Sequence, residues 1–305
     1  MRVLHVNNTG GVAATLALEQ RKLGLDADVL VFRKDLSGFS YNINLDVDRF
    51  PRLFQPVYRA WRLSKDFLNY DVYHFHSSSF VTGYIDAPFL QSIGKKIVHH
   101  HHGSDIRDKG KPFFSRFCNL RLISTPDLFD WAPDALWLPN PVFIHKSKPK
   151  LKRKKPLVVH APRQKNVHRK TIFIERVLIK LAEKDLIDYK ILPYLSHGEF
   201  MEALKNSDIF VDNLGGGWYG VSGLEAMCFG VPVCVYIRED LEKFTDLNAF
   251  CNSNEQTLEN YLERLVTSDK FWIEKSVLGR KYVERVHDSK KVAELTKKYY
   301  EKLFE

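Results

Sequence analysis

A glycine-rich segment in the second half of the chain has the composition of an anion-binding turn. Gly215-Gly216-Gly217-Trp218-Tyr219-Gly220 precedes residues 221–229, whose pattern predicts one short helix. Such a turn offers free backbone N–H groups at a helix N-terminus, where the helix dipole also favours negative charge. Glu225 lies about one turn into this helix, where its carboxylate can accept hydrogen bonds from ligand hydroxyls. A diphosphate and hydroxyls together describe a sugar nucleotide; a tight turn before an ordinary buried helix is the alternative.

A second loop in the same half concentrates cations. Four of them lie within residues 163–171, directly after a predicted strand and before a predicted helix. Arginine suits a phosphate because its planar fork can donate two parallel hydrogen bonds. The loop predicts either a phosphate-binding element or a solvated basic turn. The four cations are Arg163, Lys165, Arg169 and Lys170.

Near the start of the chain, Gly10 and Gly11 follow a predicted strand and precede a predicted helix. Glycines in this place let a phosphate or a sugar approach the backbone closely. The spacing is not the G-x-G-x-x-G of dinucleotide-binding folds, so a plain strand-to-helix turn fits equally well.

Histidines end two further predicted strands, at His74-Phe75-His76 and at His99-His100-His101-His102. Side chains alternate along a strand, so His100 and His102 share one face. Four consecutive histidines suggest a metal site, but no carboxylate or cysteine pattern completes one. His102, at the strand end before Gly103, is well placed to donate to a substrate oxygen or phosphate. Core histidines bonded to the backbone are the alternative for the others.

Strand-like and helix-like segments alternate along both halves of the chain, which predicts parallel sheets covered by helices on both faces. The pattern restarts after a connector at 146–155, so we expect doubly wound α/β domains at 1–145 and 156–285. The tail at 286–305 is expected to be a helix that packs back on the first domain. Ligands of such sheets bind beyond the carboxyl ends of the strands. The predicted strands are residues 2–7, 27–32, 71–75, 96–102, 120–125, 135–138, 156–160, 189–193, 209–212 and 231–237.

The net charge of +9 comes mainly from one short stretch. Residues 146–155 carry seven basic side chains and no acidic one, and their polar character predicts an exposed connector. Contact with an anionic membrane or a polyanion is the alternative. Nucleic acid is not the favoured partner, because the charge is concentrated in one linker.

Residues 49–65 carry five basic and four aromatic residues without an acid, which fits either an interfacial membrane segment or packing on the first domain.

The expected compartment is the cytoplasm, with peripheral contact to the inner face of the membrane as an extension of that expectation. No apolar run reaches the roughly 20 residues that cross a bilayer, and the N-terminus lacks the layout of a signal peptide. The cysteines show no metal spacing, so we expect free thiols. They are Cys118, Cys228, Cys234 and Cys251.

Taken together and in this order, these motifs resemble a retaining glycosyltransferase of family 4 (glycosyl transferases group 1). The loop Gly217-Trp218-Tyr219-Gly220 is similar to that of an archaeal and bacterial subgroup. The resemblance spans nearly the whole chain and implies the GT-B fold, in which two Rossmann-like doubly wound domains face each other across a cleft. It also implies that the second domain holds most of a nucleoside-diphosphate sugar. The motifs lie at residues 71–76, 102–107, 124–128, 138–142 and 217–233.

The resemblance assigns roles to single residues. Glu225 matches the family glutamate that binds the ribose. His102 matches the histidine near the reacting sugar, with His100 as the alternative. Arg163 and Arg169 have the spacing of the family's arginine and lysine that bind the diphosphate. Further donor contacts are expected from Gly10, Gly11, Lys170, Tyr219 and the backbone of Gly220, Val221 and Ser222, and acceptor or sugar contacts from Asp105 and Trp218.

One position departs from the family pattern. Gly217 stands eight positions before Glu225, where the family has a second glutamate that contacts the donor sugar. Asp212 or the Trp218-Tyr219 pair is a candidate to replace it; altered donor handling or loss of activity are the other interpretations.

A metal-binding Asp-x-Asp is missing from the cleft motifs, since Asp46-Val47-Asp48 lies in a polar excursion. We therefore expect transfer without a metal or another cofactor.

The expected function is transfer of a sugar from a nucleoside-diphosphate sugar to a glycan, lipid-linked or other hydroxyl acceptor, with retention of the anomeric configuration. A non-catalytic nucleotide-sugar or glycan-binding protein is the main alternative, because of Gly217. A transferase acting on nucleic acid and an epimerase on the same fold are further alternatives that the motifs support less.

Overall fold

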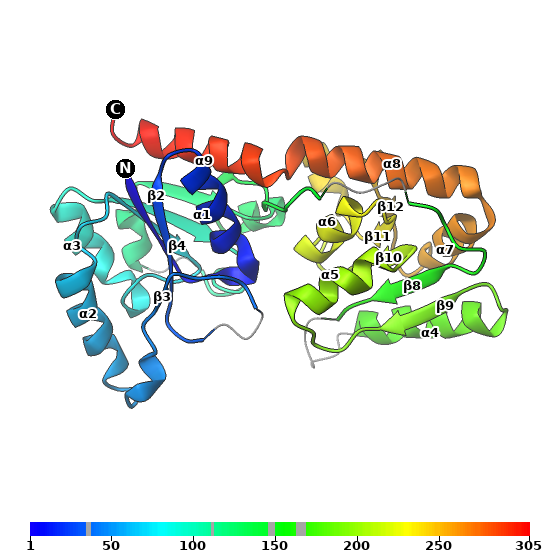
Figure 1. Ribbon diagram of the computed structural model, residues 1–305, viewed down its shortest axis with the longest axis horizontal. Helices are drawn as coiled ribbons and strands as arrows, with labels where there is room; N and C mark the ends of the chain where they lie inside the picture. Colours follow the sequence, from blue (N-terminus) through cyan, green and yellow to red (C-terminus); the bar gives the residue numbers. More distant parts are fainter. Residues whose placement is uncertain (35–37, 111–112, 146–149, 163–168) are drawn as a thin grey trace. The chain divides into compact units, whose positions relative to one another are not determined.

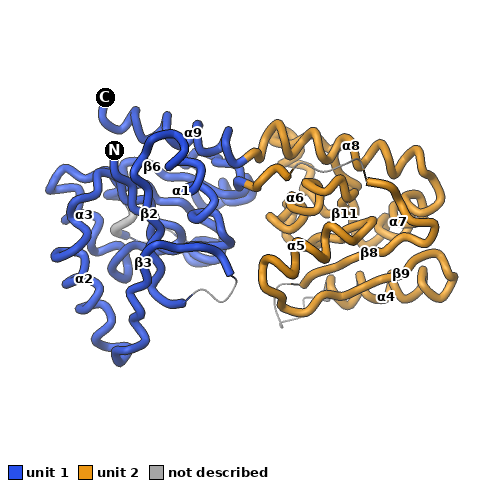
Figure 2. Tube along the Cα trace, viewed as in Figure 1, with its two compact units in different colours: residues 1–141, 289–305 blue, residues 142–288 orange. Residues whose placement is uncertain are grey.

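A computed structural model describes residues 1–34, 38–110, 113–145, 150–162 and 169–305 of the protein. The chain divides into two compact units, coloured separately in Figure 2. Unit 1 combines Met1–Pro141 with Ser289–Glu305, and unit 2 is Val142–Asp288. Each unit contains one sheet, and every strand pair among the described residues is parallel. The expected α/β class with two parallel sheets is confirmed.

The seven-stranded sheet of unit 1 has the strand order β3-β2-β1-β4-β5-β6-β7. Figure 1 labels β2, β3 and β4 of this sheet. From β1 the chain moves outward through β2 and β3 and then returns to β4 on the other side of β1. The order therefore reverses between β1 and β4, which is where doubly wound sheets leave a crevice beyond the strand ends. The strands are β1 (Arg2–Val6), β2 (Asp26–Val31), β3 (Ile43–Asn44), β4 (Val72–His76), β5 (Lys96–His101), β6 (Leu120–Ile123) and β7 (Leu136–Trp137).

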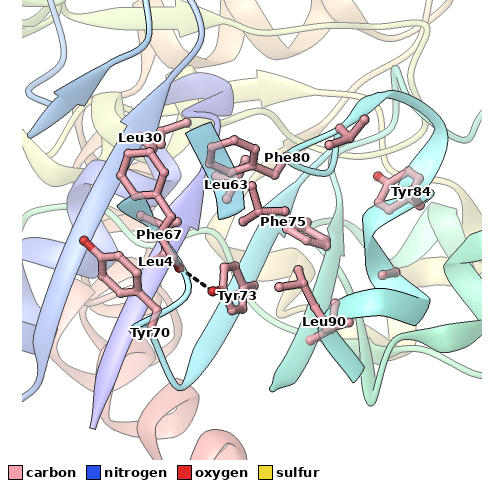
Figure 3. Packing of buried hydrophobic residues seen from close by; sticks show 14 of the residues in the cluster. Leu4, Leu30, Leu63, Phe67, Tyr70, Tyr73, Phe75, Phe80, Tyr84 and Leu90 are labelled. Carbon is pink, nitrogen blue, oxygen red and sulfur yellow. Dashed lines mark hydrogen bonds between the residues drawn. The ribbon is translucent and has the colours of Figure 1, made fainter. Parts of the chain in front are cut away.

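Helices cover both faces of this sheet. On one face, β4 contributes Tyr73 and Phe75 to a buried cluster that includes Leu63 of α2 and Leu90 of α3 (Figure 3). On the other face, Val72 packs in a cluster with residues of α1 and α9, so the end of the chain completes unit 1. The strand alternation therefore directs His74 and His76 to the face of α1 and α9. The helices are α1 (Val12–Lys22), α2 (Gln55–Asp66), α3 (Asp86–Ser92) and α9 (Ser289–Lys302).

The five-stranded sheet of unit 2 has the order β12-β11-β10-β8-β9, so its reversal lies between β8 and β10. The core of the unit includes Trp272 of α8, whose indole N–H donates to the carbonyl of Asp208 just before β10. The strands are β8 (Leu157–His160), β9 (Asp188–Ile191), β10 (Ile209–Val211), β11 (Val233–Val235) and β12 (Cys251–Asn252). The helices are α4 (Arg169–Glu183), α5 (His197–Lys205), α6 (Val221–Cys228), α7 (Leu258–Thr267) and α8 (Asp269–Val286).

Short 3-10 turns complete the connections at Thr9–Gly11, Val47–Arg49, Thr82–Tyr84, Phe113–Phe117, Pro126–Asp130, Glu239–Phe244 and Leu247–Ala249. All four cysteines are free, as expected from their spacing. Within the described ranges, none of the helices combines the length and the hydropathy needed to traverse a bilayer.

The basic connector is described from residue 150 onward, and three of its cations, Lys152, Arg153 and Lys155, form ion pairs within unit 2. Lys152 donates to the carbonyl of Val266 at 2.7 Å, and Arg153 pairs with Asp208 at 3.1 Å. These contacts fix the segment that leads into β8, so part of the connector's charge stabilises the fold of unit 2. Residues 146–149 lie outside the described residues.

Candidate functional site

The turn between β10 and α6 holds a carboxylate at the helix N-terminus. Asp212 follows β10 directly, and its Oδ2 accepts a hydrogen bond at 2.8 Å from the backbone N–H of Gly220, the N-cap of α6. The helix dipole stabilises a negative charge in this place. One of the three N–H groups expected to hold a diphosphate is therefore bonded to a protein carboxylate. The groups of Val221 and Ser222 are the remaining expected contacts.

Gly223 lets this carboxylate approach the first turn of α6. A Cβ atom at Gly223 would lie 2.7 Å from Oδ2 of Asp212 and 3.3 Å from Cγ1 of Val233. The first distance is shorter than real Cβ contacts, so any side chain here would displace the carboxylate. The sequence G-V-S-G at the start of α6 thus fixes both the helix start and its packing between β10 and β11.

Glu225 is the strongest sign of a ligand in unit 2. Its side chain is buried, and Oε1 lies 2.7 Å from Nε2 of His197. Its other oxygen, Oε2, is buried without a hydrogen-bond partner among the described residues. Leaving a buried acceptor unsatisfied typically costs about 1–3 kcal/mol. A ligand hydroxyl that donates to Oε2 would remove this cost.

His197 was not predicted from the sequence as a site residue. It is the first residue of α5, which begins with a capping box formed by Ser196 and Glu199. The S-x-x-E pattern marks this helix start in the sequence. It does not reveal that the first turn of α5 lies against Glu225, because that contact depends on how α5 packs on α6.

The backbone conformation of Gly217 explains why this position holds a glycine. Its φ of +71° lies in the left-handed region, and an added Cβ would meet Arg238 Cδ at 2.9 Å. Arg238 also donates its backbone N–H to the carbonyl of Gly217 at 3.0 Å. A glutamate at this position would be strained and would collide with Arg238. The loop is therefore built around glycine where the resembled family has a carboxylate.

Restoring that carboxylate is expected to destabilise the protein. Gly217→Glu should lower the free energy of unfolding by roughly 1–3 kcal/mol, because a non-glycine residue adopts this backbone only under strain. Thermal and urea unfolding measure the loss. Gly198→Glu is the control, because a Cβ there meets nothing within 4 Å and Gly198 has no positive φ. A Gly217→Glu protein as stable as the wild type would contradict this account.

The two aromatic residues of the loop lie in the core of unit 2. Trp218 and Tyr219 are both buried, and their ring centroids lie 4.4 Å apart. The Tyr219 hydroxyl hydrogen-bonds with that of Tyr282 at 2.6 Å and with Nε2 of His287 at 3.0 Å. Burial raises the pKa of Tyr219 well above its ordinary value. The structure thus places the Tyr219 side chain among core residues, and only its backbone is retained as an expected donor contact.

In the sequence, the basic loop follows β8 and the glycine loop follows β10. β8 and β10 are neighbours, with His160 in register with Val211. Lys170, in the first turn of α4, pairs with Glu255 at 2.7 Å, and a Cβ on Gly215 would lie 3.3 Å from Lys170 Cγ. The start of α4 therefore lies beside the glycine loop. Arg163 lies outside the described residues, and Arg169 is described only as the first residue of α4.

In unit 1, the glycine pair after β1 has a structural explanation. Gly10 and Gly11 have φ values of +60° and +77°, and the ring of Phe39 occupies the space where a Gly11 Cβ would lie. The close approach that Gly11 permits is thus made by a protein side chain. A sugar or phosphate contact at this turn stays a prediction.

His102 follows β5 and is half-buried. Its backbone N–H donates to Oδ1 of Asp105 at 3.0 Å, and Oδ2 of Asp105 accepts from Nδ1 of His101 at 2.7 Å. Burial alone raises the pKa of Asp105, but the hydrogen bond from His101, the electrostatic effects of His101 and His99 and the backbone N–H of His102 together outweigh it and bring the pKa well below the ordinary range. Both carboxylate oxygens therefore bind the turn that carries His102, and Asp105 positions this residue. Burial lowers the pKa of His102 to about 4, so it is neutral at pH 7.

A hydrogen-bonded chain connects His102 to the interior of unit 1. Nε2 of His102 lies 3.0 Å from Nδ1 of His76, and Nε2 of His76 lies 3.0 Å from Nδ1 of His5. Nε2 of His5 meets Oε1 of Gln20 at 2.8 Å. Gln20 in turn donates to the hydroxyl of Tyr300 in α9 at 3.3 Å. The sequence indicated His76 and His102 but not His5, Gln20 and Tyr300. The last two lie 280 positions apart.

Comparison with solved structures identifies the architecture. Sucrose-phosphate synthase from Thermosynechococcus elongatus matches 100% of this chain and 99% of its own, with a TM-score of 0.69 and 12% identity. TarM of S. aureus, in complex with UDP, matches with a TM-score of 0.63, 11% identity and 99% coverage of both chains. The lipopolysaccharide outer core galactosyltransferase WaaB matches with a TM-score of 0.62, 12% identity and coverage of 99% and 100%.

No family model and no curated protein matches the sequence. At identities near one residue in eight, the structural likeness establishes the fold and leaves the reaction to be argued from the site. Two parallel α/β sheets of seven and five strands, matched over their whole length by these glycosyltransferases, define the architecture. The chain has the GT-B fold.

Proposed function

We propose that this protein is a glycosyltransferase that moves a sugar from a nucleoside-diphosphate sugar to a hydroxyl acceptor with retention of the anomeric configuration. The observation that carries the proposal is the unpartnered, buried Oε2 of Glu225, beside the start of α6. A ribose hydroxyl supplies the missing donor. The diphosphate then lies near the N–H groups of Val221 and Ser222, at the sheet edge that doubly wound folds use for ligands.

In the proposed reaction, the bond between the anomeric carbon and the diphosphate oxygen breaks, and negative charge accumulates on the leaving group. Arg163, Arg169 and the N-terminus of α6 stabilise that charge. The acceptor oxygen bonds to the same carbon from the side of the leaving group, and its proton passes to the departing phosphate oxygen. His102, neutral at pH 7 and with its Nε2 facing His76, accepts a hydrogen bond from a sugar hydroxyl. None of these steps needs a side chain that is a strong nucleophile.

The first experiment is a panel of nucleoside diphosphates and nucleotide sugars scored by thermal shift, with nucleotide release followed in the same wells. Uridine nucleotides head the panel, because the structurally similar TarM is found with UDP. A ligand present at 100 times its dissociation constant should add roughly 2.7 kcal/mol of stability. Release of the nucleoside diphosphate in EDTA supports metal-independent transfer. Binding without release supports the non-catalytic alternative, and complete loss of activity in EDTA, restored by manganese, contradicts metal independence.

We further propose that the acceptor is reached at an anionic membrane surface. The support is a patch on and just before α2 formed by four exposed residues: Leu53, Phe54, Val57 and Trp61 are 81%, 57%, 67% and 51% exposed. Their spacing places them on one side of the helix. Lys65 lies 5.0 Å from the Trp61 ring, and Arg52 is exposed nearby. Packing on the domain, the other expectation for this segment, holds for Leu63 but not for Phe54 and Trp61.

Removing the two large aromatic residues of the patch is expected to weaken membrane binding. Phe54→Ser with Trp61→Ser should lower partition onto vesicles containing phosphatidylglycerol at least tenfold, because partial burial of two such side chains is worth more than about 1.4 kcal/mol. Vesicle co-sedimentation measures it. Ile273→Ser is the matched control, since this exposed residue lies on α8 of unit 2. Equal binding of the double variant and the wild type would eliminate the patch as a membrane contact.

A further inference from the structure

Three imidazoles from adjacent strands converge at the carboxyl ends of β4 and β5. His76 ends β4 and is in register with His100 of β5, and His102 follows β5 on the same face. Each of the three offers one nitrogen, and these nitrogens lie within 4.8 Å of one another. We call His76, His100 and His102 the three-histidine cluster.

The ring nitrogens of His100, Nδ1 and Nε2, have no hydrogen-bond partner within the described part of the chain. His100 is fully buried. A neutral imidazole carries one N–H donor and one lone pair, and burying both without partners is unfavourable. A buried histidine that packs as a core residue normally bonds to the backbone, as His160 does to the carbonyl of Val211. His100 instead faces the rings of His76 and His102, at centroid distances of 5.4 Å and 4.2 Å.

The interior side chains determine which nitrogen of His76 carries its proton. Gln20 donates its amide N–H to Tyr300, so its Oε1 accepts from His5. The proton of His5 is then on Nε2, and its Nδ1 accepts from Nε2 of His76. Nδ1 of His76 is left with a lone pair directed at Nε2 of His102, 3.0 Å away. Outer partners that fix the tautomer of a histidine in this way are typical of metal ligands.

We propose that the three-histidine cluster binds one divalent transition-metal ion of the zinc, nickel or copper class. Imidazole nitrogens suit these ions, and three histidines with one open position form a known type of zinc ligand set. Neighbouring ligands of a tetrahedral zinc lie roughly 3.4 Å apart, close to the separation of the His76 and His102 nitrogens. Half-buried His102 provides access. The ion takes the place of the proton between His76 and His102, and that proton moves to Nδ1 of His102.

An ion bound to Nε2 of His102 leaves the proton of this ring on Nδ1, so that Nδ1 can no longer accept a hydrogen bond from the sugar. This consequence, inhibition of transfer by the ion, rests on the proposed function, whereas binding itself does not. The site is therefore tested by binding. Chelator-treated, untagged protein is titrated with zinc chloride in an isothermal calorimeter, and one equivalent is expected to bind.

Variants assign the ligands. His100→Phe and His102→Ala are each expected to weaken zinc binding more than tenfold, and His145→Ala, at an exposed position of unit 2, to leave it unchanged. The Gln20→Leu variant removes the acceptor of the His5 proton, one residue beyond the direct partner of His76, and should weaken zinc binding by up to about tenfold, the lower end of the range for direct partners of a ligand. Bound cobalt(II) provides a second readout, since its visible absorption reports nitrogen ligation. His102 is half-buried, so His102→Ala is expected to fold. This variant therefore still tests the site if His100→Phe does not fold.

Two results would overturn the proposal. One is a wild-type protein that binds no zinc. The other is binding that survives both His100→Phe and His102→Ala. In the latter case, loss of binding in His101→Gln would move the ion to the opposite face of β5, where His99, His101 and Asp105 form another candidate group.

Discussion

Replacing Arg163 by alanine is expected to lower kcat roughly 100- to 1000-fold, with a smaller effect on KM. The arginine is proposed to stabilise the negative charge that develops on the leaving diphosphate. Such an interaction is stronger in the transition state than with bound substrate, so its loss affects the chemical step more than binding. The comparison is of steady-state kinetics of nucleotide release for the wild type and Arg163→Ala.

The position of β8 in the fold supports this choice. Arg163 comes three residues after β8 in the sequence, β8 lies next to β10, and α6, which follows β10, begins with the proposed diphosphate contacts. Arg169, at the start of α4, is the second expected cation, and Arg169→Ala should lower kcat in the same direction. Arg163→Lys should retain part of the activity, because an ammonium keeps the charge without the two parallel hydrogen bonds.

Arg176→Ala is the matched control for both arginines. Arg176 is exposed on α4, so its removal changes the charge of the same helix away from the strand edge. If Arg163→Ala lowers kcat no more than Arg176→Ala does, the diphosphate is bound elsewhere and the mechanism proposed above is wrong.

Replacing Glu225 by alanine is expected to weaken nucleotide binding about 10- to 100-fold, a free-energy change of roughly 1.4–2.8 kcal/mol. The buried Oε2 has no partner among the described residues, so the nucleotide provides its hydrogen bond. Hydrogen bonds to a charged group are typically worth about 1.5–3 kcal/mol, which agrees with this range. Isothermal titration with the nucleotide that the panel identifies measures the dissociation constant.

Glu225→Gln separates charge from shape. It keeps one carbonyl oxygen and the volume of the side chain, so affinity should fall less than in Glu225→Ala. Without ligand, neither variant should be much less stable than the wild type, because the carboxylate is buried with one oxygen unsatisfied. Glu202→Gln, an exposed position on neighbouring α5, is the control. Unchanged affinity in Glu225→Ala would remove the main support for the donor site.

The sequence was sufficient for most of the strands and for the start of α6, but it missed the two-residue strands β3 and β12. Alternation of apolar segments predicted β4 and β5 close to their observed bounds, and the glycine turn predicted the start of α6. These features depend on neighbours a few residues apart, because strand alternation and helix starts are set by local backbone preferences. The order of motifs along the chain also predicted the fold correctly.

The sequence did not predict contacts between side chains that lie far apart in the chain. Nothing near Gly217 in the sequence indicates Arg238, yet this arginine fills the space that a glutamate would need. In the same way, Tyr219 had the composition of a ligand contact and proved to be a core residue bonded to Tyr282. In both cases the deciding contact is made only when distant elements of unit 2 come together.

The sequence by itself thus determined two parallel α/β sheets, a glycine-rich turn before the helix of Glu225, and histidines at the ends of β4 and β5. Only the tertiary structure decided what those residues face. It brought His197 to one oxygen of Glu225 and left the other unpartnered, and it linked His76 through His5 to Gln20 and Tyr300. The reason is physical: local preferences fix the path of the backbone, whereas hydrogen-bond partners are chosen by the packing of segments that the sequence keeps apart.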